Sequence, residues 1–355
     1  MSRLNRLSNR FEQPSQLHVN WSTTISDYVI DLAWSPDGRY IAAASVLGTV
    51  TIFEGSHGAV INTFEGHEFG TMSIAWHPDS KVLASSGQDG KIRLWDTTSG
   101  EATHSFEGGA SWVEHLAWSD GDKPILASAA GRKLKLWNAV GDLVCEYPDH
   151  QSTIYGIQWK PRERQLASIT YGGVTLWDPQ QPEAIRRLEW KGSSLVIAWS
   201  PDGKYIATGD QDSTVHFWIM STGEDLQMYG YPTKVQELSW DATCRFLATG
   251  GGLDVTVWDC SGNGPAGTKP ISLSGHLNFI SVVCFQHNGK LLVSGDADGL
   301  VYVWELQGRR SSRAIHEATL TAGVTNLLWA PNDEYIAVGD ESGRVSVFQF
   351  VNLQD

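Results

Sequence analysis

The sequence predicts an all-β fold made of eight repeats, and three observations support this. Eight runs of alternating apolar residues each end on an aromatic residue, and these aromatics lie 40 to 45 residues apart. A second aromatic follows each of them by 18 or 19 residues, and turns rich in Gly, Pro and Asp separate the runs. Such a period is typical of propeller blades with four strands each. We therefore expect an eight-bladed β-propeller of four-stranded antiparallel blades, with seven blades as the alternative.

One repeat shows the expected order of strands. Residues 71–76 form an inner strand that ends on Trp76, and residues 81–86 form the second strand after the turn HPDS. Residues 91–95 form the third strand after GQDG, and an outer strand follows around 101–108. Pro presets the backbone early in such turns, and Asp-Gly accepts the positive φ that comes later. Most of the 16 tryptophans then serve to fill the space between blades.

The outer strands number seven for eight repeats, so one is missing. Residues 17–24 (LHVNWSTT) can supply it by pairing with the last strand, residues 344–350, which would close the ring. We expect a propeller over residues 16–355 and a flexible tail over residues 1–15. Seven blades would require one irregular repeat, and the first, with Phe53 in place of Trp and Ala43 where Ser is usual, is the expected misfit.

Composition narrows the class of function. The net charge of −14 disfavours nucleic acid as a partner, because binding to phosphates relies on basic side chains. No segment reads as a membrane span or a signal peptide. The four cysteines show no CxxC pairing, which favours a reducing, cytoplasmic location over a disulfide framework.

The repeats resemble those of the WD-repeat (WD40) β-propeller family. The resemblance rests on Gly-His pairs before inner strands, at 66–67 and 275–276, and on Trp-Asp pairs at 95–96, 177–178 and 258–259. It implies two complete structural tetrads, His67, Ser85, Asp89 and Trp95, and His276, Ser294, Asp298 and Trp304. We interpret these as turn-stiffening networks and not as catalytic triads, because no oxyanion donors accompany them. No catalytic residue and no cofactor is expected.

The same resemblance implies that partners bind on the top face, where inner strands begin. Several aromatic residues fall there without being needed for packing between blades, and aromatic side chains dominate binding hot spots. Arginine is absent from these positions, which disfavours a reader of phosphopeptides. We expect a non-enzymatic scaffold or adaptor that docks a protein or peptide, within a larger complex. The expected contact residues are Tyr28, Phe69, Trp112, Glu114, Tyr155, Gln211, Lys234, Gln236 and Phe279.

The alternative is a metal-binding, ligand-binding or enzymatic propeller. Cys244, Cys260, Cys284 and His287 fall near the bottom of adjacent blades, and thiolate and imidazole are suitable metal ligands if they converge. A site in the central channel would need titratable groups on the inner strands, where Asp31 and His115 stand alone.

Overall fold

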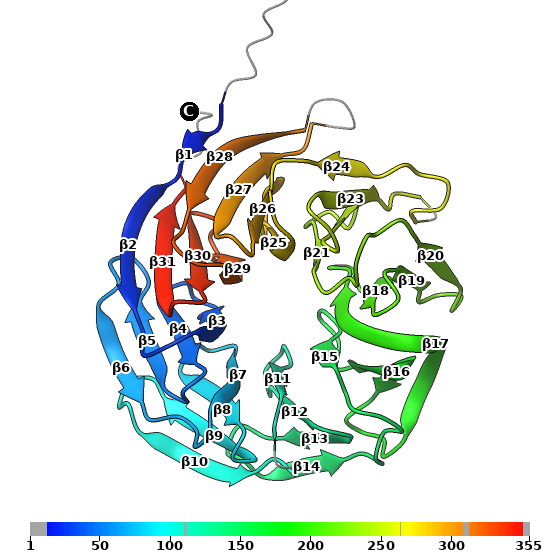
Figure 1. Cartoon of the computed structure of the whole chain (residues 1–355). Helices are drawn as coiled ribbons and strands as arrows, with labels where there is room; N and C mark the ends of the chain where they lie inside the picture. The colour runs from blue at the N-terminus through cyan, green and yellow to red at the C-terminus, as the bar shows by residue number, and fades with distance from the viewer. Residues whose placement is uncertain (1–12, 110–111, 263, 308–311, 351–355) are drawn as a thin grey trace, which may run out of the picture.

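A computed structural model describes residues 13–109, 112–262, 264–307 and 312–350, and within these ranges the regular structure is entirely β. The strands form a ring around a central axis (Figure 1). Within these ranges, no helix long and apolar enough to cross a membrane is found. The expected tail, residues 1–15, lies mostly outside the described residues, but Ser15 already belongs to a strand.

The strands follow the predicted order within each repeat. The first three repeats comprise β3 (Val29–Trp34), β4 (Tyr40–Ser45), β5 (Val50–Glu54), β6 (Val60–Phe64); β7 (Thr71–Trp76), β8 (Val82–Gly87), β9 (Lys91–Asp96), β10 (Ala102–Glu107); β11 (His115–Trp118), β12 (Leu126–Ala130), β13 (Lys133–Trp137) and β14 (Leu143–Glu146). The next two comprise β15 (Gly156–Trp159), β16 (Leu166–Trp177), β17 (Ala184–Trp199), β18 (Tyr205–Asp210), β19 (Val215–Ile219) and β20 (Asp225–Met228). The last three comprise β21 (Leu238–Trp240), β22 (Phe246–Thr249), β23 (Val255–Asp259), β24 (Ile271–Leu273); β25 (Ile280–Phe285), β26 (Leu291–Asp296), β27 (Leu300–Glu305), β28 (Arg313–Thr319); β29 (Val324–Trp329), β30 (Tyr335–Asp340) and β31 (Arg344–Gln349).

Hydrogen bonds join the described strands into seven sheets, which is the count that the alternative gave. The expectation of eight separate blades needs this correction because the fourth and fifth repeats share one six-stranded sheet, β15 to β20. Strand β17 is the outer strand of one repeat and the inner strand of the next, and it runs on without a break (Figure 1). The inner strands of all eight repeats still contact one another in ring order. The expected misfit, the first repeat, forms a regular four-stranded sheet.

Indole N–H groups of the first aromatic series tie neighbouring repeats together. Four of these tryptophans donate to a backbone carbonyl on the inner strand of the preceding repeat, about one period back along the chain. These four tryptophans therefore both fill the gap between neighbouring repeats and donate to a carbonyl there. The four bonds run from Trp76 to Ala33 (3.1 Å), Trp159 to Ala117 (2.9 Å), Trp240 to Ala198 (3.2 Å) and Trp329 to Cys284 (3.2 Å).

Closure of the ring agrees with the prediction. Strand β2 (His18–Thr24) pairs antiparallel with β31, and the Trp21 ring packs in a tilted arrangement against Phe53 of the first repeat, with ring centroids 5.6 Å apart. The Trp21 indole also donates to the carbonyl of Gly55 at 2.8 Å. Just before it, β1 (Ser15–Gln16) pairs in parallel with β28 of the seventh repeat. The N-terminal segment therefore bridges two neighbouring sheets (Figure 1).

The second aromatic series forms the expected networks, with one correction. In the second repeat, His67 contacts Asp89 (2.9 Å) and Ser85 (2.8 Å), and Trp95 donates to the Ser85 hydroxyl (2.8 Å). In the seventh repeat, His276 contacts Ser294 (2.7 Å) and Trp304 donates to the same hydroxyl (2.8 Å).

The carboxylate of that second tetrad is Asp296, at 2.8 Å from His276 Nδ1, and not Asp298. Asp296 ends strand β26, where its side chain is fully buried beside the imidazole. Asp298 lies in the following turn and instead accepts a hydrogen bond from the Asn278 amide at 3.0 Å. The prediction of Asp298 was therefore wrong.

Candidate partner-binding face

The top face consists of the loops that enter the inner strands and the turns between second and third strands. Backbone hydrogen bonds hold these two kinds of segment together. Gln88 N donates to Gly70 O at 3.0 Å, Ala297 N to Phe279 O at 3.1 Å, and Gln211 N to Ser193 O at 3.0 Å. Side chains on this face therefore project from a fixed backbone, which lowers the entropic cost of binding.

Exposed large apolar side chains of the described residues are sorted between faces. Six lie on outer strands, at the rim of the ring. One, Val140, lies in a bottom turn, and the remaining eight cluster on top, together with Tyr229 after β20. An apolar surface of this kind marks an interaction site more often than isolated exposed residues do. The top-face members are Leu47, Phe69, Trp112, Tyr155, Tyr171, Leu253, Leu277 and Phe279.

Phe69 is the most informative of the predicted residues. Its side chain is 77% exposed, and its backbone φ of 67° is in the left-handed region that bulky residues rarely adopt. Added strain of this kind persists where the surroundings impose it, and it gathers at functional sites. The flanking contacts impose it here, because Gly70 N donates to His67 O and Gly70 O accepts from Gln88 N. The loop thus presents a phenyl ring to solvent at a conformational cost.

The structure places most of the other predicted residues on the same face. Trp112, Phe279 and Tyr155 are 52%, 49% and 45% exposed. Tyr28 is less available than expected, because it is half-buried and burial, reinforced by Glu341, raises the pKa of its phenol. Glu114 is also half-buried. The polar members Gln211, Lys234 and Gln236 are exposed.

Sequence reasoning missed several aliphatic and aromatic members of the face. Leu277 is 84% exposed and Leu47 is 64% exposed, and both lie in top loops. Leu253 comes close to Phe279, since Ile280 N donates to Gly252 O at 2.9 Å. The predicted contact set took aromatic and polar residues from the top loops and no leucine, although a leucine in a Gly-rich loop that no repeat needs for packing carries the same signal.

The tetrad in the second repeat has the electrostatics of a structural network. Burial lowers the pKa of His67, so the imidazole is neutral at pH 7 despite its carboxylate partner. Burial alone would raise the pKa of Asp89, but hydrogen bonds from His67 and Arg93 outweigh it and lower that pKa. The Ser85 hydroxyl already accepts from Trp95 and is fully buried. It is therefore closed to a substrate.

The four candidate metal ligands do not assemble. Across the described ranges, no group of three or more His, Cys, Asp or Glu side chains is placed to hold a metal ion. Burial raises the pKa of the Cys260 thiol, and it raises that of Cys284 to about 11, which disfavours the thiolate that a metal requires. Cys244 also has a raised pKa, and His287 instead contacts Asp333 at 3.2 Å.

Of the two titratable residues expected on the inner strands, Asp31 has structural hydrogen-bond partners. Asp31 accepts backbone N–H groups from Ile74 (2.8 Å) of the next repeat and from Leu32 (2.9 Å). Burial nevertheless raises the pKa of Asp31 to about 6, and burial lowers that of His115 to about 4. Two other inner-strand side chains make the same kind of bridge, Gln158 to Trp199 N and Ser239 to Phe285 N. Asp31 therefore clamps two repeats together.

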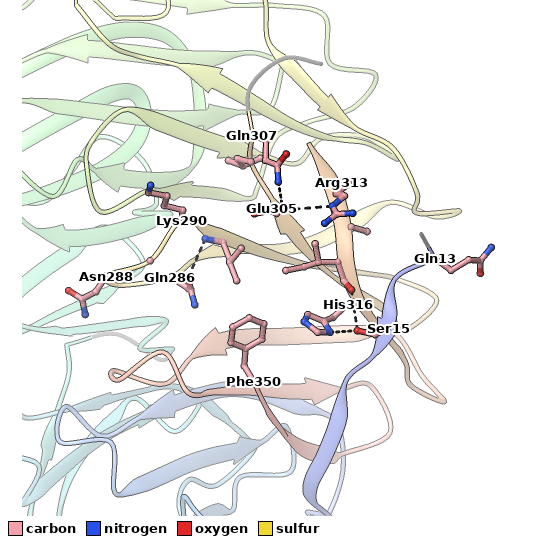
Figure 2. A pocket seen from close by; sticks show the side chains of 15 residues that line it. Gln13, Ser15, Gln286, Asn288, Lys290, Glu305, Gln307, Arg313, His316 and Phe350 are labelled. Carbon is pink, nitrogen blue, oxygen red and sulfur yellow. Dashed lines mark hydrogen bonds and ion pairs between the residues drawn. The ribbon is translucent and has the colours of Figure 1, made fainter. Parts of the chain in front are cut away.

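Two hollows lie at the rim. The larger, about 1020 Å³, lies where the N-terminal strand meets the seventh repeat, and its lining includes Lys290, Glu305, His316 and Phe350 (Figure 2). Its polar groups are engaged with one another, as Ser15 bonds to His316 at 2.6 Å and Glu305 contacts Arg313 at 3.7 Å. The second, about 960 Å³, flanks β16 and β17. Neither brings together a nucleophile, a base and oxyanion donors.

Comparison with known proteins identifies the repeats. The family model described as "WD domain, G-beta repeat" matches residues 19–54, 58–96, 189–218 and 267–305. A probable cytosolic iron-sulfur protein assembly protein 1 of Mycosarcoma maydis is 28% identical over 46% of this chain and 38% of its own length. THO complex subunit 3 of Arabidopsis thaliana is 24% identical over 55% of this chain and 61% of its own length.

One further curated relative and one solved structure also match. The cell division cycle 20.1 protein of Arabidopsis thaliana, a cofactor of the APC complex, is 30% identical over 50% of this chain and 40% of its own length. The chain thus spans less than two thirds of the length of these curated relatives. A solved structure of the computationally designed Ika8 protein has a TM-score of 0.80 at 22% identity, covering 95% of this chain and all of that one. The chain therefore carries WD40 repeats at the four matched segments, and its curated relatives and its fold are similar to those of WD-repeat β-propellers.

Proposed function

We propose that this protein is a non-enzymatic scaffold or adaptor that docks a protein or peptide partner on its top face. The relatives named above include an assembly protein, a complex subunit and a complex cofactor, which supports work in protein complexes. A cytoplasmic location and partners other than nucleic acid are part of the proposal. They are supported by the four free cysteines and the net charge of −14.

The observation that carries the proposal is the exposed, left-handed Phe69 among the apolar residues of the top face. When a partner covers an exposed phenyl ring, the burial of its apolar surface makes the free energy of binding more favourable. The cost in side-chain entropy is small because the ring projects from a fixed backbone. Phe279 and Trp112 extend the same surface around the ring. Affinity would come from these aromatics, and the surrounding charge would set specificity.

Affinity purification of tagged variants tests the proposal. The double variant Phe69→Ala and Phe279→Ala removes two exposed rings without touching the packing between repeats, so the fold should persist. Each lost hot-spot ring should weaken binding about 30-fold, as expected for about 2 kcal/mol, so co-purifying proteins seen with the wild type should be lost.

The matched control is Val144→Ala with Ile185→Ala, which removes exposed apolar side chains from outer strands instead. This control should recover the same proteins as the wild type. Equal recovery of the same proteins by the top-face variant and the wild type would contradict docking on this face.

A further inference from the structure

The fifth repeat has lost the imidazole of its tetrad. Strand pairing sets the correspondence, because Ser194 pairs with Asp210 as Ile280 pairs with Asp296 in the seventh repeat. Four residues before Ile280 stands His276, and four residues before Ser194 stands Trp190. The other tetrad positions keep polar groups, since Thr208, Asp210 and Trp218 stand where the seventh repeat has Ser294, Asp296 and Trp304.

The polar groups left behind are buried and lack partners. Thr208 and Asp210 are fully buried, and Ser194 and His216 are 1% exposed. Neither hydroxyl, neither Asp210 carboxylate oxygen, nor His216 Nε2 has a hydrogen-bond partner in the described part of the chain. The buried indole N–H groups of Trp218 and Trp190 also lack a hydrogen-bond partner among the described residues. In the seventh repeat the equivalent atoms are bonded at 2.7 to 2.8 Å.

These groups share one small region between the fourth and fifth repeats. The Trp190 ring lies 3.9 Å from the His216 ring, and the His216 and Trp218 rings are 5.7 Å apart. His216 Nδ1 contacts Asp225 at 3.1 Å, so its hydrogen goes to that carboxylate and Nε2 is left as an acceptor. Burial raises the pKa of Asp210 to about 7, and the nearby hydroxyls of Ser194 and Thr208 offset only part of this.

The donors and acceptors in this region complement those of water. Asp210 and His216 Nε2 need donors, Trp218 needs an acceptor, and the two hydroxyls can serve either way. Buried water molecules occur where unsatisfied polar groups converge, and they make about three hydrogen bonds each. We propose that the fifth repeat binds an ordered water molecule among Thr208, Asp210 and His216, in the role that the imidazole has in the seventh repeat.

The site lies directly beneath the top face. The backbone carbonyl of Asp210 accepts a hydrogen bond from Val235 N at 3.2 Å, and Val235 stands between the exposed residues Lys234 and Gln236. The water therefore stabilises the end of β18, to which this top-face loop is hydrogen-bonded. The inference does not depend on what the loop binds.

Two measurements test the inference. A high-resolution crystal structure of the wild type should show a solvent peak within hydrogen-bond distance of Asp210 and Thr208. In the variant Trp190→His, the restored imidazole should displace this water, lower the pKa of Asp210 by about one unit or more, and raise the denaturation midpoint. NMR titration of the Asp210 carboxyl carbon reports the pKa.

Trp190→Phe is the control, because it removes the indole without supplying a polar group. Its Asp210 titration should stay near that of the wild type. The inference is overturned if the wild-type structure shows no solvent between Asp210 and Thr208. It is equally overturned if Trp190→His leaves the Asp210 titration where Trp190→Phe leaves it.

Discussion

At the scale of single residues, repeats differ in how many hydrogen bonds one buried serine hydroxyl makes. Ser85 is hydrogen-bonded to both an imidazole and an indole, whereas Ser128 of the third repeat has Trp137 as its one side-chain partner among the described residues, at 2.8 Å. Both hydroxyls are buried, at 0% and 1% exposure. Repeats of similar sequence therefore differ in the number of polar groups that depend on one atom.

This difference predicts unequal effects of the same substitution. Ser85→Ala leaves two buried polar groups unsatisfied and should lower the free energy of unfolding by about 2–5 kcal/mol, while Ser128→Ala leaves one and should cost about 1–3 kcal/mol. Denaturant unfolding followed by tryptophan fluorescence measures both. Equal losses would show that His67 finds another partner when the hydroxyl is removed.

Glu237 predicts a dependence of stability on pH. Its side chain packs over Gly250, where an added Cβ would stand 2.2 Å from the Glu237 Oε2 atom, and burial raises the pKa of the carboxyl to about 7. A carboxyl with a raised folded pKa contributes stability below its ordinary value near 4.5, and this contribution is lost as pH rises through about 7.

The variant Glu237→Gln should therefore be more stable than the wild type at pH 8, by roughly 1–2 kcal/mol after allowance for partial solvent access, and should show little gain at pH 4. Thermal unfolding across this pH range measures the effect. The same change at the exposed Glu101 serves as the control. A wild-type profile that Glu237→Gln merely shifts downward at every pH would refute the prediction.

The histidines and serines of the tetrads were predicted correctly, but the aspartate of the seventh repeat was not. The resemblance to WD-repeat propellers implied His67 and His276 with Ser85 and Ser294, and the contacts of both histidines with these serines are present. Asp296 and Asp298 are two residues apart across the end of a strand, and only the geometry of the turn decides which carboxylate meets the imidazole. The sequence does not encode that geometry locally.

At the scale of elements, the N-terminal strand β2 carries the closure of the ring. It covers the open edge of β31, and its Trp21 is 8% exposed against the first repeat. Exposed strand edges of this kind promote association between chains. The loss of one buried side chain on β2 should therefore affect both stability and the state of association.

Trp21→Ala should lower the free energy of unfolding by about 3–5 kcal/mol, as expected for a large buried aromatic, and should promote aggregation through the edge of β31. Differential scanning calorimetry combined with light scattering follows both effects. Val19→Ala on the same strand is the control, because Val19 is 58% exposed. If the two variants behave alike, β2 does not hold the ring closed through Trp21.

Element order was predictable from the sequence, and strand continuity was not. The alternating runs placed the second repeat within one residue of its observed strands. The run Tyr171-Gly172-Gly173 lies inside β16, and both glycines have φ near +110°. Tyr171 pairs with Ser193 and Gly173 with Glu189, so β16 stays paired with β17 on both sides of Gly172. Glycine in a turn reads the same in the sequence whether or not the pairing continues.

At the scale of the whole molecule, stability should vary around the ring. The sixth repeat has the shortest ladder, with three-residue strands at β21 and β24, whereas β25 to β28 of the seventh repeat have six or seven residues each. Short strands offer fewer ladder hydrogen bonds that must break together, so local opening costs less there.

Hydrogen exchange should show this asymmetry. Amides of β21 and β24 should exchange at least 10-fold faster than those of β26 and β27 under native conditions, as expected for about 1.4 kcal/mol less local stability. Mass spectrometry of peptic fragments resolves the two regions. Uniform protection around the ring would mean that the propeller opens only as a whole.

The candidate surface was predictable in place and only partly in composition. Loops at the start of inner strands were identified from the repeat, and four of their aromatics are exposed as expected. Tyr28 is half-buried, and burial together with the charge of Glu341 in the last repeat raises the pKa of its phenol, so this interaction links two distant parts of the sequence. Contacts across the closure are the part of a ring that local sequence patterns describe least well.

The shared strand β17 has a mechanical consequence. Elsewhere a wedge can tilt about its connecting loop without moving its neighbour, but here a stiff extended backbone passes from the periphery of one wedge to the axis of the next. Tyr171 of β16 pairs with β17, so a force applied at Tyr171 would be transmitted along β17 toward the axis of the ring. The fourth and fifth wedges should therefore shift as a single body when a ligand presses on that side.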